Sequence, residues 1–556
     1  MKKFSWILGA VVIVVIAGSF WPTARNLVFP LTIERALKSV EWREDYVTRR
    51  AHLSPTGGAD LAATLPSIDT FSMVVNPRKR SNELRLEIFS SSEKAGKGDD
   101  GWLVEATKAF NSKKQTTAQG QTIQVALRKI ASGTGYQFIA SGKHLPHAFT
   151  PSNHLWVKMV EAQGTKTTAI RERLVKNTAG VVLKKSKAEE LRQSYPKLDL
   201  QSLTTAVTKG DLVMGYTNPF ASSTGLNFLV SVLQSYAGEA NLSILDPSVT
   251  SAFEQFQQRV PFVALTTLQM RDSVERGGSL DSFIMEHQTF VKASALRSGY
   301  EFLPFGILHD NPLYGIGDLS ETEVEGLEIF AKFLDSAHWQ RKATDYGFNA
   351  DLDYSGAEIA AGGELLQAQR IWKEHKDVGR PVAAVFLADT SGSMDGSRIR
   401  ALKEALIQGS EFVSPNNAIG LVAFSSEVVS QLEINTFDLD QKARFHAAVQ
   451  GFYAGGTTVI YDGIVVALHQ LQQFTAKNPS HKPILIVLSD GEPNGGYSFG
   501  DVEPLIIDAN IPTYTIGYEA DLSELKKLSA LVEAASIDAG QAEVRYKIGS
   551  LLNAQM

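Results

Sequence analysis

Residues Pro381 to Ser393, which read PVAAVFLADTSGS, decide how the C-terminal part of this chain folds. The run from Val382 to Ala388 is apolar throughout, and such runs are typical of strands in parallel sheets that helices cover on both faces. Asp389 and the hydroxyls of Ser391 and Ser393 follow at once. Because ligands bind at the carboxyl ends of the strands in such sheets, the pattern puts an oxygen-rich cluster at a predicted binding edge.

Two further oxygen donors follow in order along the chain. Thr457 lies in the Gly-rich segment GGTT at 455–458, and Asp490 ends the next apolar strand, in LSDG at 488–491. Carboxylates and hydroxyls without Cys or His suit a hard cation, Mg²⁺ or alternatively Mn²⁺ or Ca²⁺. Mg²⁺ takes six oxygens, so the motif alone leaves its shell incomplete. The alternative is a polar loop in which Ser393 or Asp395 only caps the following helix.

These motifs resemble those of a known protein family. Residues 376–556 resemble a von Willebrand factor A domain, and DTSGSM at 389–394, GGTT and LSDG are similar to its metal-ion-dependent adhesion site. The resemblance implies a doubly wound, Rossmann-like fold in which a divalent cation is held by the following residues: Asp389, Ser391, Ser393, Thr457 and, often through water, Asp490. It also implies that an acidic residue of a protein partner completes the shell of the cation.

The preceding part of the chain, residues 83–350, shows strands, Ser-rich turns and helices in succession, which is a doubly wound α/β pattern. The segments SSSEK at 90–94, PHAFTPSNHLW at 146–156 and GYTNPFASSTGLNFLVSVL at 215–233 resemble periplasmic solute-binding proteins. That family has two lobes, which we expect at about 83–165 with a return after 290, and at about 167–290.

The resemblance implies a small-molecule ligand between the lobes. The implied contacts are Ser91, Ser92, Ser132, Pro151, Ser152, Asn218, Ser223, Thr224 and Glu286. Hydroxyls and amides at helix N-termini can capture an anion without a basic cluster. For each serine the alternative is a role in a turn or a helix cap.

The N-terminal residues predict a membrane segment. Lys2 and Lys3 precede the almost uncharged run from Phe4 to Trp21, which has the minimum length of a spanning helix. An uncleaved signal anchor at 1–24 is the main interpretation, and a cleaved signal peptide is the alternative. Residues 25–82 then form a juxtamembrane helix, predicted at Leu31 to Tyr46, and a linker.

We therefore predict an α/β protein made of a two-lobed solute-binding-protein-like module at 83–350, a helical connector at 351–375 and the domain at 376–556, with an N-terminal transmembrane helix. Within the last domain, strands are expected at 417–428 and 511–518, and helices at 438–452, 461–474, 522–535 and near the C-terminus. The absence of cysteine excludes disulfides and thiol catalysis, and a net charge of −6 argues against nucleic-acid binding.

The main hypothesis is a binding protein without enzymatic activity, anchored in the cytoplasmic membrane by a single pass, with its bulk on the periplasmic or extracellular side. A metal-dependent contact with a protein partner would be its activity. One alternative is a solute-binding sensor or transport accessory; another is a cytoplasmic partner of an AAA⁺ ATPase. A hydrolase is weaker still, because the G-x-S-x-G match at 496–500 lacks the strand that a nucleophile elbow requires directly before its serine.

Overall fold

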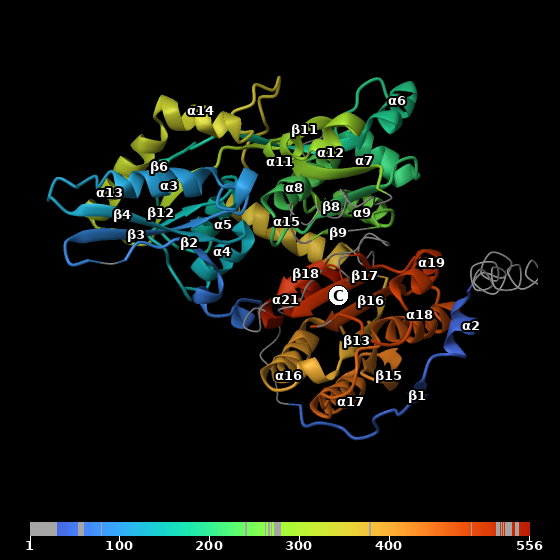
Figure 1. The fold of residues 1–556 in the computed structure, drawn as a ribbon. Coiled ribbons are helices and arrows are strands. Elements are labelled where there is room, and N and C mark those ends of the chain that lie inside the picture. The colour runs from blue at the N-terminus through green and yellow to red at the C-terminus, as the bar shows by residue number, and fades with distance from the viewer. Residues whose placement is uncertain are drawn as a thin grey trace, which may run out of the picture.

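The chain folds into a two-lobed α/β domain and a C-terminal α/β domain, joined by one long helix (Figure 1). The computed structural model describes residues 31–53, 61–78, 80–238, 242–261, 263–264, 267, 270–271, 280–376, 380–490, 492–518, 523, 525, 527–528, 536–539 and 544–556. The predicted anchor at 1–24 lies outside these residues. Among the described residues, no helix combines the length and the apolar character needed to cross a bilayer.

The C-terminal domain is built on a seven-stranded sheet in the order β1-β15-β14-β13-β16-β17-β18. Its strands are β13 (Val382–Asp389), β14 (Ala418–Phe424), β15 (Val428–Thr436), β16 (Lys482–Ser489), β17 (Thr513–Tyr518), β18 (Ser536–Ala539) and β1 (Trp42–Glu44). The strands from β14 to β18 in this order run parallel, and β15 is antiparallel to β14. The central strand β13 is buried along its whole length, as its apolar sequence predicts.

Helices cover both faces of this sheet. They are α16 (Ser397–Gly409), α17 (Leu439–Gln450), α18 (Ile460–Lys477), α19 (Phe499–Ala509) and α21 (Val544–Gln555). Alternate residues of β13 point to opposite faces: Ala384 and Phe386 belong to the core with α16, α17 and α21, whereas Val385 and Leu387 belong to the core with α18 and α19. The predicted doubly wound fold is therefore confirmed, and the predicted helix at 522–535 lies largely outside the described residues.

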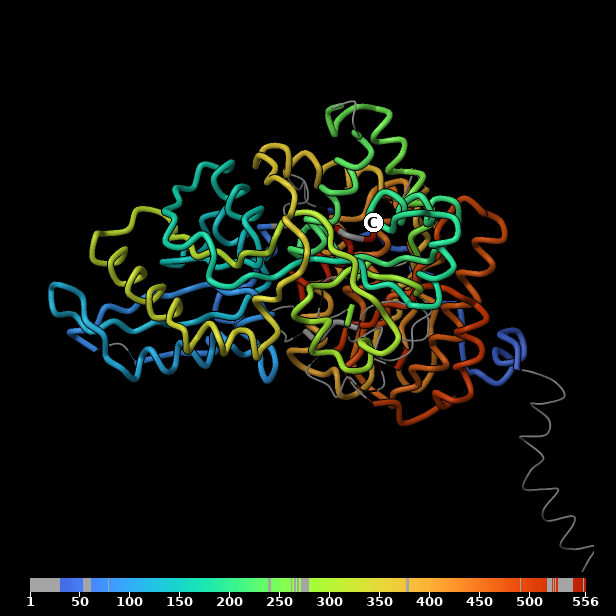
Figure 2. Tube along the Cα trace, turned by 90° about the horizontal axis from the view of Figure 1, so that it is seen from above, coloured from blue at the N-terminus to red at the C-terminus, as the bar shows by residue number. Residues whose placement is uncertain are grey.

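An N-terminal arm, residues 31–53, packs on the C-terminal domain and not on the lobes that follow it in sequence. Figures 1 and 2 show the arm in blue beside the orange and red elements. Its helix α2 (Ile33–Leu37) contributes to the core with α18, and β1 pairs in parallel with β15. The predicted helix from Leu31 to Tyr46 is wrong beyond α2, because pairing with the open edge of β15 holds residues 42–44 extended.

The first lobe contains a six-stranded sheet in the order β2-β4-β3-β5-β12-β6. Its strands are β2 (Met73–Val75), β3 (Glu83–Ser90), β4 (Thr122–Lys129), β5 (Ala148–Thr150), β6 (Thr167–Arg171) and β12 (Leu313–Ile316). Its helices are α3 (Trp102–Ser112), α4 (Ser132–Ala140), α5 (Leu155–Ala162), α13 (Glu321–Leu334) and α14 (Ala337–Asp345). Strand β3 lies between β4 and β5 and runs parallel to both, and Ser91 follows directly at its carboxyl end.

The second lobe contains a five-stranded sheet in the order β11-β7-β10-β8-β9. Its strands are β7 (Asn177–Lys184), β8 (Met214–Thr217), β9 (Val263–Ala264), β10 (Ser282–Glu286) and β11 (Tyr300–His309). Its helices are α6 (Lys185–Ser194), α7 (Leu200–Lys209), α8 (Ser223–Ala237), α9 (Pro247–Gln257), α11 (His287–Lys292) and α12 (Ser294–Gly299).

The chain crosses between the lobes at residues 172–176 and 310–312. This corrects the expected lobe boundaries, since β6 still belongs to the first sheet and β11, beyond residue 290, still belongs to the second. The two crossing segments are bonded to each other by an ion pair of 2.5 Å between Arg173 Nε and Asp310 Oδ1.

Helix α15 (Gly362–His375) and helix α21 join the two domains. Lys373 Nζ on α15 donates to the carbonyl oxygen of Asn553 at 2.6 Å. On α21, the hydroxyl of Tyr546 donates to Gln137 Oε1 at 2.9 Å and lies 3.0 Å from Thr134 Oγ1, both on α4. Helix α4 also contacts the second lobe, because Gly133 N donates to the carbonyl oxygen of Ala221. A Cβ atom at Gly133 would lie 2.1 Å from the carbonyl oxygen of Phe220, so only glycine permits this approach.

Candidate functional site

Asp389 is the last residue of β13, and its carboxylate is fully buried below the DTSGS loop. Its Oδ1 accepts a hydrogen bond of 2.8 Å from the backbone N–H of Ser391, and its Oδ2 accepts one of 2.5 Å from the hydroxyl of Ser489. Burial raises the pKa of Asp389 despite these hydrogen bonds, and the nearby charge of Asp490 acts in the same direction. The loop therefore holds an anionic oxygen in a place that favours a compensating positive charge.

The two serines of the motif link Asp389 to Asp490 at the end of β16. Ser391 Oγ and Ser393 Oγ are 3.0 Å apart, and Ser393 Oγ donates to Asp490 Oδ1 at 2.7 Å. Ser393 itself is exposed, whereas Ser391 is buried. The carboxyl ends of two adjacent parallel strands thus bring four of the predicted donors into one hydrogen-bonded cluster that reaches the surface.

The fifth predicted donor, Thr457, lies in the neighbouring loop before α18. The two loops are bonded through their backbones: Gly392 N donates to the carbonyl oxygen of Gly456 at 3.1 Å, and Gly455 N donates to that of Thr390 at 2.9 Å. Gly456 has a φ of +83°, a conformation that glycine adopts without strain. The hydroxyl of Thr457 donates to Ser426 Oγ at 3.2 Å, so Ser426, which sequence reasoning missed, orients it.

The chemistry of this cluster fits a divalent cation held mainly by neutral oxygens. Among the described residues, no group of three or more His, Asp or Glu side chains could hold a metal ion, so hydroxyl oxygens must supply part of any shell. Asp389 and Asp490 provide two carboxylates beside the hydroxyls of Ser391 and Ser393. Such an all-oxygen set suits Mg²⁺, Mn²⁺ or Ca²⁺ better than zinc.

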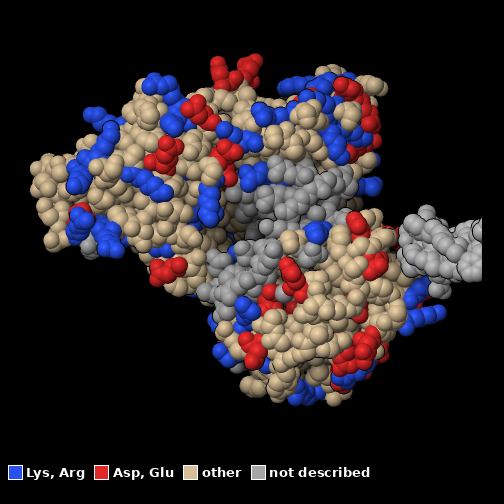
Figure 3. Space-filling model, in the orientation of Figure 1, with Lys and Arg blue, Asp and Glu red and all other residues tan. Residues whose placement is uncertain are grey.

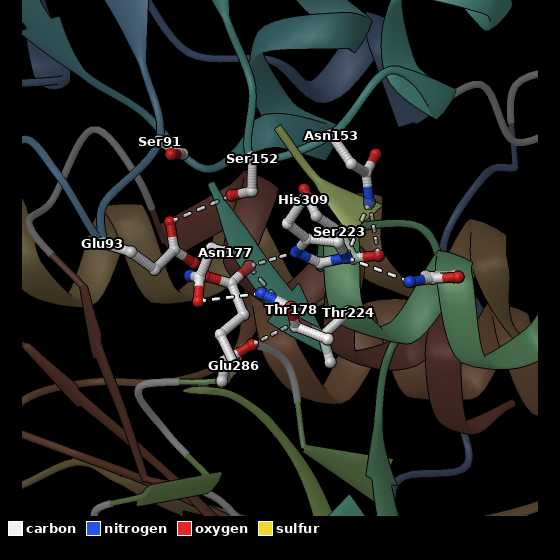
Figure 4. A network of polar contacts seen from close by, with 12 residues as sticks. Ser91, Glu93, Ser152, Asn153, Asn177, Thr178, Ser223, Thr224, Glu286 and His309 are labelled. Carbon is white, nitrogen blue, oxygen red and sulfur yellow. Dashed lines mark hydrogen bonds and ion pairs between the residues drawn. The ribbon is translucent and has the colours of Figure 1, made fainter. Parts of the chain in front are cut away.

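A second polar cluster, the inter-lobe network, lies where the two lobes meet (Figure 4). It brings together five of the residues predicted to contact a ligand: Ser91, Ser152, Ser223, Thr224 and Glu286. Ser152 Oγ donates to Glu93 Oε2 at 3.4 Å, and Thr224 Oγ1 donates to Glu286 Oε1 at the same distance. Ser223 accepts from the first lobe through both its oxygens, from Trp156 Nε1 at 2.9 Å and from Asn153 Nδ2 at 3.2 Å.

Glu286 and His309 form the buried centre of the inter-lobe network. His309 Nε2 lies 3.1 Å from Asn153 Nδ2 and 3.2 Å from Asn227 Nδ2, and both amide nitrogens are donors. Nε2 therefore accepts, and Nδ1 carries the proton that it donates to Glu286 Oε1 at 2.8 Å. Asn177 donates to the other oxygen, Oε2, at 2.9 Å. Both oxygens of Glu286 thus accept hydrogen bonds, and the side chains of His309 and Glu286 are 0% and 1% exposed.

Glu93 and Lys94 approach the inter-lobe network from the turn after β3. The ammonium of Lys94 is buried and donates to Ser91 Oγ at 2.6 Å, to the carbonyl oxygens of Thr150 and Pro151, and to Asn311 Oδ1 at 3.1 Å. Burial lowers the pKa of Lys94 to about 7. Burial and the charge of Glu286 raise the pKa of Glu93 to about 7. Lys94 is bonded to neutral oxygens of the first lobe and of the crossing segment, and its charge acts on both Glu93 and Glu286.

The remaining predicted contacts have local roles in the structure. Pro151 offers its carbonyl oxygen to Lys94. Asn218 Oδ1 accepts from Phe220 N at 2.8 Å and so forms the turn before α8. Ser132 is buried as the first residue of α4, and Ser92 is partly exposed beside Glu93. Sequence reasoning missed Glu93, Lys94, Asn153, Asn177, Asn227 and His309; for Glu93 and Lys94 the signal was their place directly after the serine cluster.

Comparisons with known proteins agree with the two folds. A family model for the von Willebrand factor type A domain matches residues 384–542, and one for bacterial extracellular solute-binding proteins matches residues 96–349. The chain therefore joins a bacterial extracellular solute-binding domain to a von Willebrand factor type A (VWA) domain. Inter-alpha-trypsin inhibitor heavy chain H4 of Bos taurus is 28% identical over 138 residues, which cover 24% of this chain and 14% of that protein.

Two solved structures represent the two parts. The von Willebrand factor type A protein from Catenulispora acidiphila aligns with a TM-score of 0.28 and 19% identity, over 31% of this chain and 42% of that one. The sulfate-binding protein SubI from Mycobacterium tuberculosis H37Rv aligns with a TM-score of 0.35 and 13% identity, over 50% of this chain and 95% of that one.

Proposed function

We propose that this protein is a membrane-anchored envelope binding protein, without enzymatic activity, whose VWA domain uses a divalent cation to bind an acidic residue of a protein partner. The observation that carries the proposal is the cluster at the carboxyl edge of β13 and β16. There Asp389 is buried, its neighbours are hydroxyls, and Ser393 reaches the surface. VWA domains commonly bind divalent metals and mediate protein interactions, which supports the proposal.

Each residue of the cluster has a defined part in this function. The cation would be held by Asp389, Ser391, Ser393 and Thr457. Asp490 would act indirectly, through the hydrogen bond that it accepts from Ser393. The cation would supply Lewis acidity toward a carboxylate oxygen of the partner. Because the hydroxyls are neutral, they cancel little of the cation's charge. Asp389 fixes the loop by accepting from Ser391 N and Ser489 Oγ, so the donors are oriented before any ligand arrives.

The proposed location is supported by the sequence of the N-terminus and by the type of domain. Residues 1–24 would anchor the protein in the cytoplasmic membrane, and the bulk would lie on the periplasmic or extracellular side, where solute-binding domains work. Since the arm at residues 31–53 packs on the VWA domain, this domain and not the solute-binding domain would be the first to follow the anchor.

The metal site is tested by calorimetric titration of the full-length protein with Mg²⁺. We expect one site in the wild type and an affinity at least about 100-fold weaker in Asp389→Asn. Asp395→Asn is the matched control, because Asp395 is an exposed carboxylate in the same loop. Equal affinity in wild type and Asp389→Asn would sink the assignment.

The partner is tested by capture from envelope extract on immobilised full-length protein. We expect a protein that is retained with Mg²⁺, released by EDTA and not retained by Asp389→Asn. A set of retained proteins that is the same in all three arms would contradict metal-dependent binding.

The inter-lobe network favours a second candidate function, capture of a small solute. Two carboxylates, Glu93 and Glu286, lie here beside the single ammonium of Lys94, so a cationic solute such as an amine would be preferred over an oxyanion. Such a solute would have to replace contacts that now join the lobes, for example Trp156 with Ser223. A thermal-shift screen with amines, sugars and oxyanions tests this: stabilisation by sulfate or phosphate alone would contradict it.

A further inference from the structure

Arg398, in the first turn of α16, directly contacts the candidate metal site formed by Asp389, Ser391, Ser393, Thr457 and Asp490, which is called the metal cluster below. Its Nη1 donates to Asp490 Oδ2 at 2.8 Å and to the carbonyl oxygen of Ser393 at 3.0 Å. The Asp490 side chain is 0% exposed, whereas the Arg398 side chain is 33% exposed. The guanidinium therefore covers a buried carboxylate from the solvent side.

With this contact, both carboxylate oxygens of Asp490 accept a hydrogen bond. Oδ1 accepts from the hydroxyl of Ser393, and Oδ2 accepts from Arg398. Arg398 thus compensates the charge of one carboxylate of the cluster. A divalent cation held by Asp389 and the serines would share Asp490 with a guanidinium of the same sign of charge, and close like charges in a partly buried place repel each other strongly.

We propose that Arg398 sets the charge of the metal site, which weakens the binding of the divalent cation and strengthens the selection of an anionic partner group. The inference rests on the proposed function of the VWA domain. Asp389 and Asp490 together would balance a divalent cation. Arg398 adds one positive charge, so the loaded site keeps an excess positive charge that only an anionic group compensates. Arg398 is a positioning and specificity residue, and it acts on the metal through Asp490.

The first test measures metal affinity with Mn²⁺ as the probe, by electron paramagnetic resonance of free Mn²⁺ in titrations of the full-length protein. Arg398→Ala should bind Mn²⁺ about ten-fold more tightly than wild type, because a repelling charge is removed. Arg398→Lys, which keeps the charge, should remain near wild type. The matched control is Arg400→Ala, since Arg400 is an exposed arginine of the same helix. Arg398→Gln is a second neutral variant in case Arg398→Ala folds poorly.

The second test measures selection of the anion with acetate as the probe. Acetate that binds to protein-held Mn²⁺ displaces water and lowers the enhancement of water proton relaxation. We expect acetate to bind several-fold more weakly to Mn²⁺-loaded Arg398→Ala or Arg398→Gln than to wild type. A general loss of structure would not raise the affinity for Mn²⁺ and lower the affinity for acetate in the same variant.

Three results would overturn the inference. Unchanged Mn²⁺ affinity in both neutral variants would show that Arg398 does not set the charge of the site. Weaker Mn²⁺ binding in both would show that Arg398 only holds Asp490 in place. If wild type binds no Mn²⁺, the proposed function fails and the inference fails with it, which separates this outcome from the other two.

Discussion

The metal cluster of the VWA domain and the inter-lobe network use the same kinds of side chain, carboxylates and hydroxyls, but bond them differently. In the metal cluster, hydroxyls bond to one another and to Asp490, and Ser393 reaches the surface. In the inter-lobe network, Glu286 accepts from His309, Asn177 and Thr224 and is nearly inaccessible. The first arrangement leaves the hydroxyl of Ser393 at the surface, whereas the second uses its polar groups to hold the two lobes together.

The difference teaches that polarity alone does not define a binding site. Polar groups that satisfy one another in the interior contribute mainly to the stability and to the unique geometry of the fold. A polar group that reaches the surface, as Ser393 does, contributes less stability and is accessible to a ligand. Substitutions in the inter-lobe network should therefore mainly lower the stability of the fold, whereas substitutions in the metal cluster should mainly lower the affinity for a ligand.

The largest effect is expected in the inter-lobe network. Glu286→Ala should lower the free energy of unfolding of the solute-binding domain by about 3–5 kcal/mol, because it leaves the N–H groups of His309 and Asn177 buried without an acceptor. Urea denaturation of the full-length protein, followed by circular dichroism, measures this. The control is Glu189→Ala, an exposed carboxylate on α6. A loss below about 1 kcal/mol would show that the network is not needed to hold the lobes.

The next effect is expected at the metal cluster and only when metal is present. At a Mg²⁺ concentration 100 times the dissociation constant, wild type should gain about 2.7 kcal/mol of stability in the VWA transition. Asp389→Asn should gain nothing, and in EDTA it should differ little from wild type, because asparagine keeps an acceptor for the N–H of Ser391. Differential scanning calorimetry with Mg²⁺ and with EDTA measures both states. If Mg²⁺ instead stabilised the thermal transition of the solute-binding domain, the metal would bind outside the VWA domain.

A smaller effect concerns pH. Burial and the charge of Glu286 raise the pKa of Glu93 to about 7, so the folded state keeps a proton that the unfolded state releases above about 4.5. The folded state thus binds more protons between these values, and its stability falls as the pH rises from about 4.5 to 7. Glu93→Gln should remove this dependence and raise the stability at pH 8 by about 1–2 kcal/mol. Denaturation midpoints measured at several pH values check it; a dependence that persists in the variant would assign the proton to another group.

The smallest effect is expected where the two domains meet. Tyr546→Phe removes the hydroxyl that bonds Thr134 and Gln137 on α4, and should cost about 1 kcal/mol. Because both bonds cross the domain boundary, the thermal transitions of the two domains should move apart in calorimetry. Tyr453→Phe, on an exposed tyrosine of the VWA domain, is the control. Coincident transitions in the variant would show that α15 alone couples the domains.

The grouping of Asp389, Ser391 and Ser393 could be predicted from the sequence because its determinants are local, whereas metal binding there stays a prediction. Asp389, Ser391 and Ser393 directly follow a strand whose apolar run shows both its burial and its end. Arg398 was missed because nothing in the motif indicates which way the first turn of α16 presents its side chains. Ser489 was missed although it directly precedes Asp490 at the end of β16.

The inter-lobe network could be predicted only in part, because its members meet through strand register. His309 lies opposite Asn177 on antiparallel neighbours β11 and β7, and Glu286 lies opposite Ala179 on β10 and β7. A shift of one residue would turn each of these side chains to the other face, and the sequence does not show the register. Strand β1 was missed for a similar reason, since its three residues, one half-buried and two exposed, carry no periodic pattern.

The N-terminal arm also determines the order in which the molecule can be completed. Arg43 and Glu427 form an ion pair beside the junction of β1 and β15, although 384 residues separate them in sequence. At the usual rate of synthesis, β15 becomes available roughly 20–80 s after β1. The whole solute-binding domain is synthesised within that interval and is in effect an insertion into the VWA domain. Until then the arm lacks the strand with which it pairs, so the solute-binding domain can fold while its N-terminal side is still unattached, and the pairing of β1 with β15 closes the VWA sheet around it.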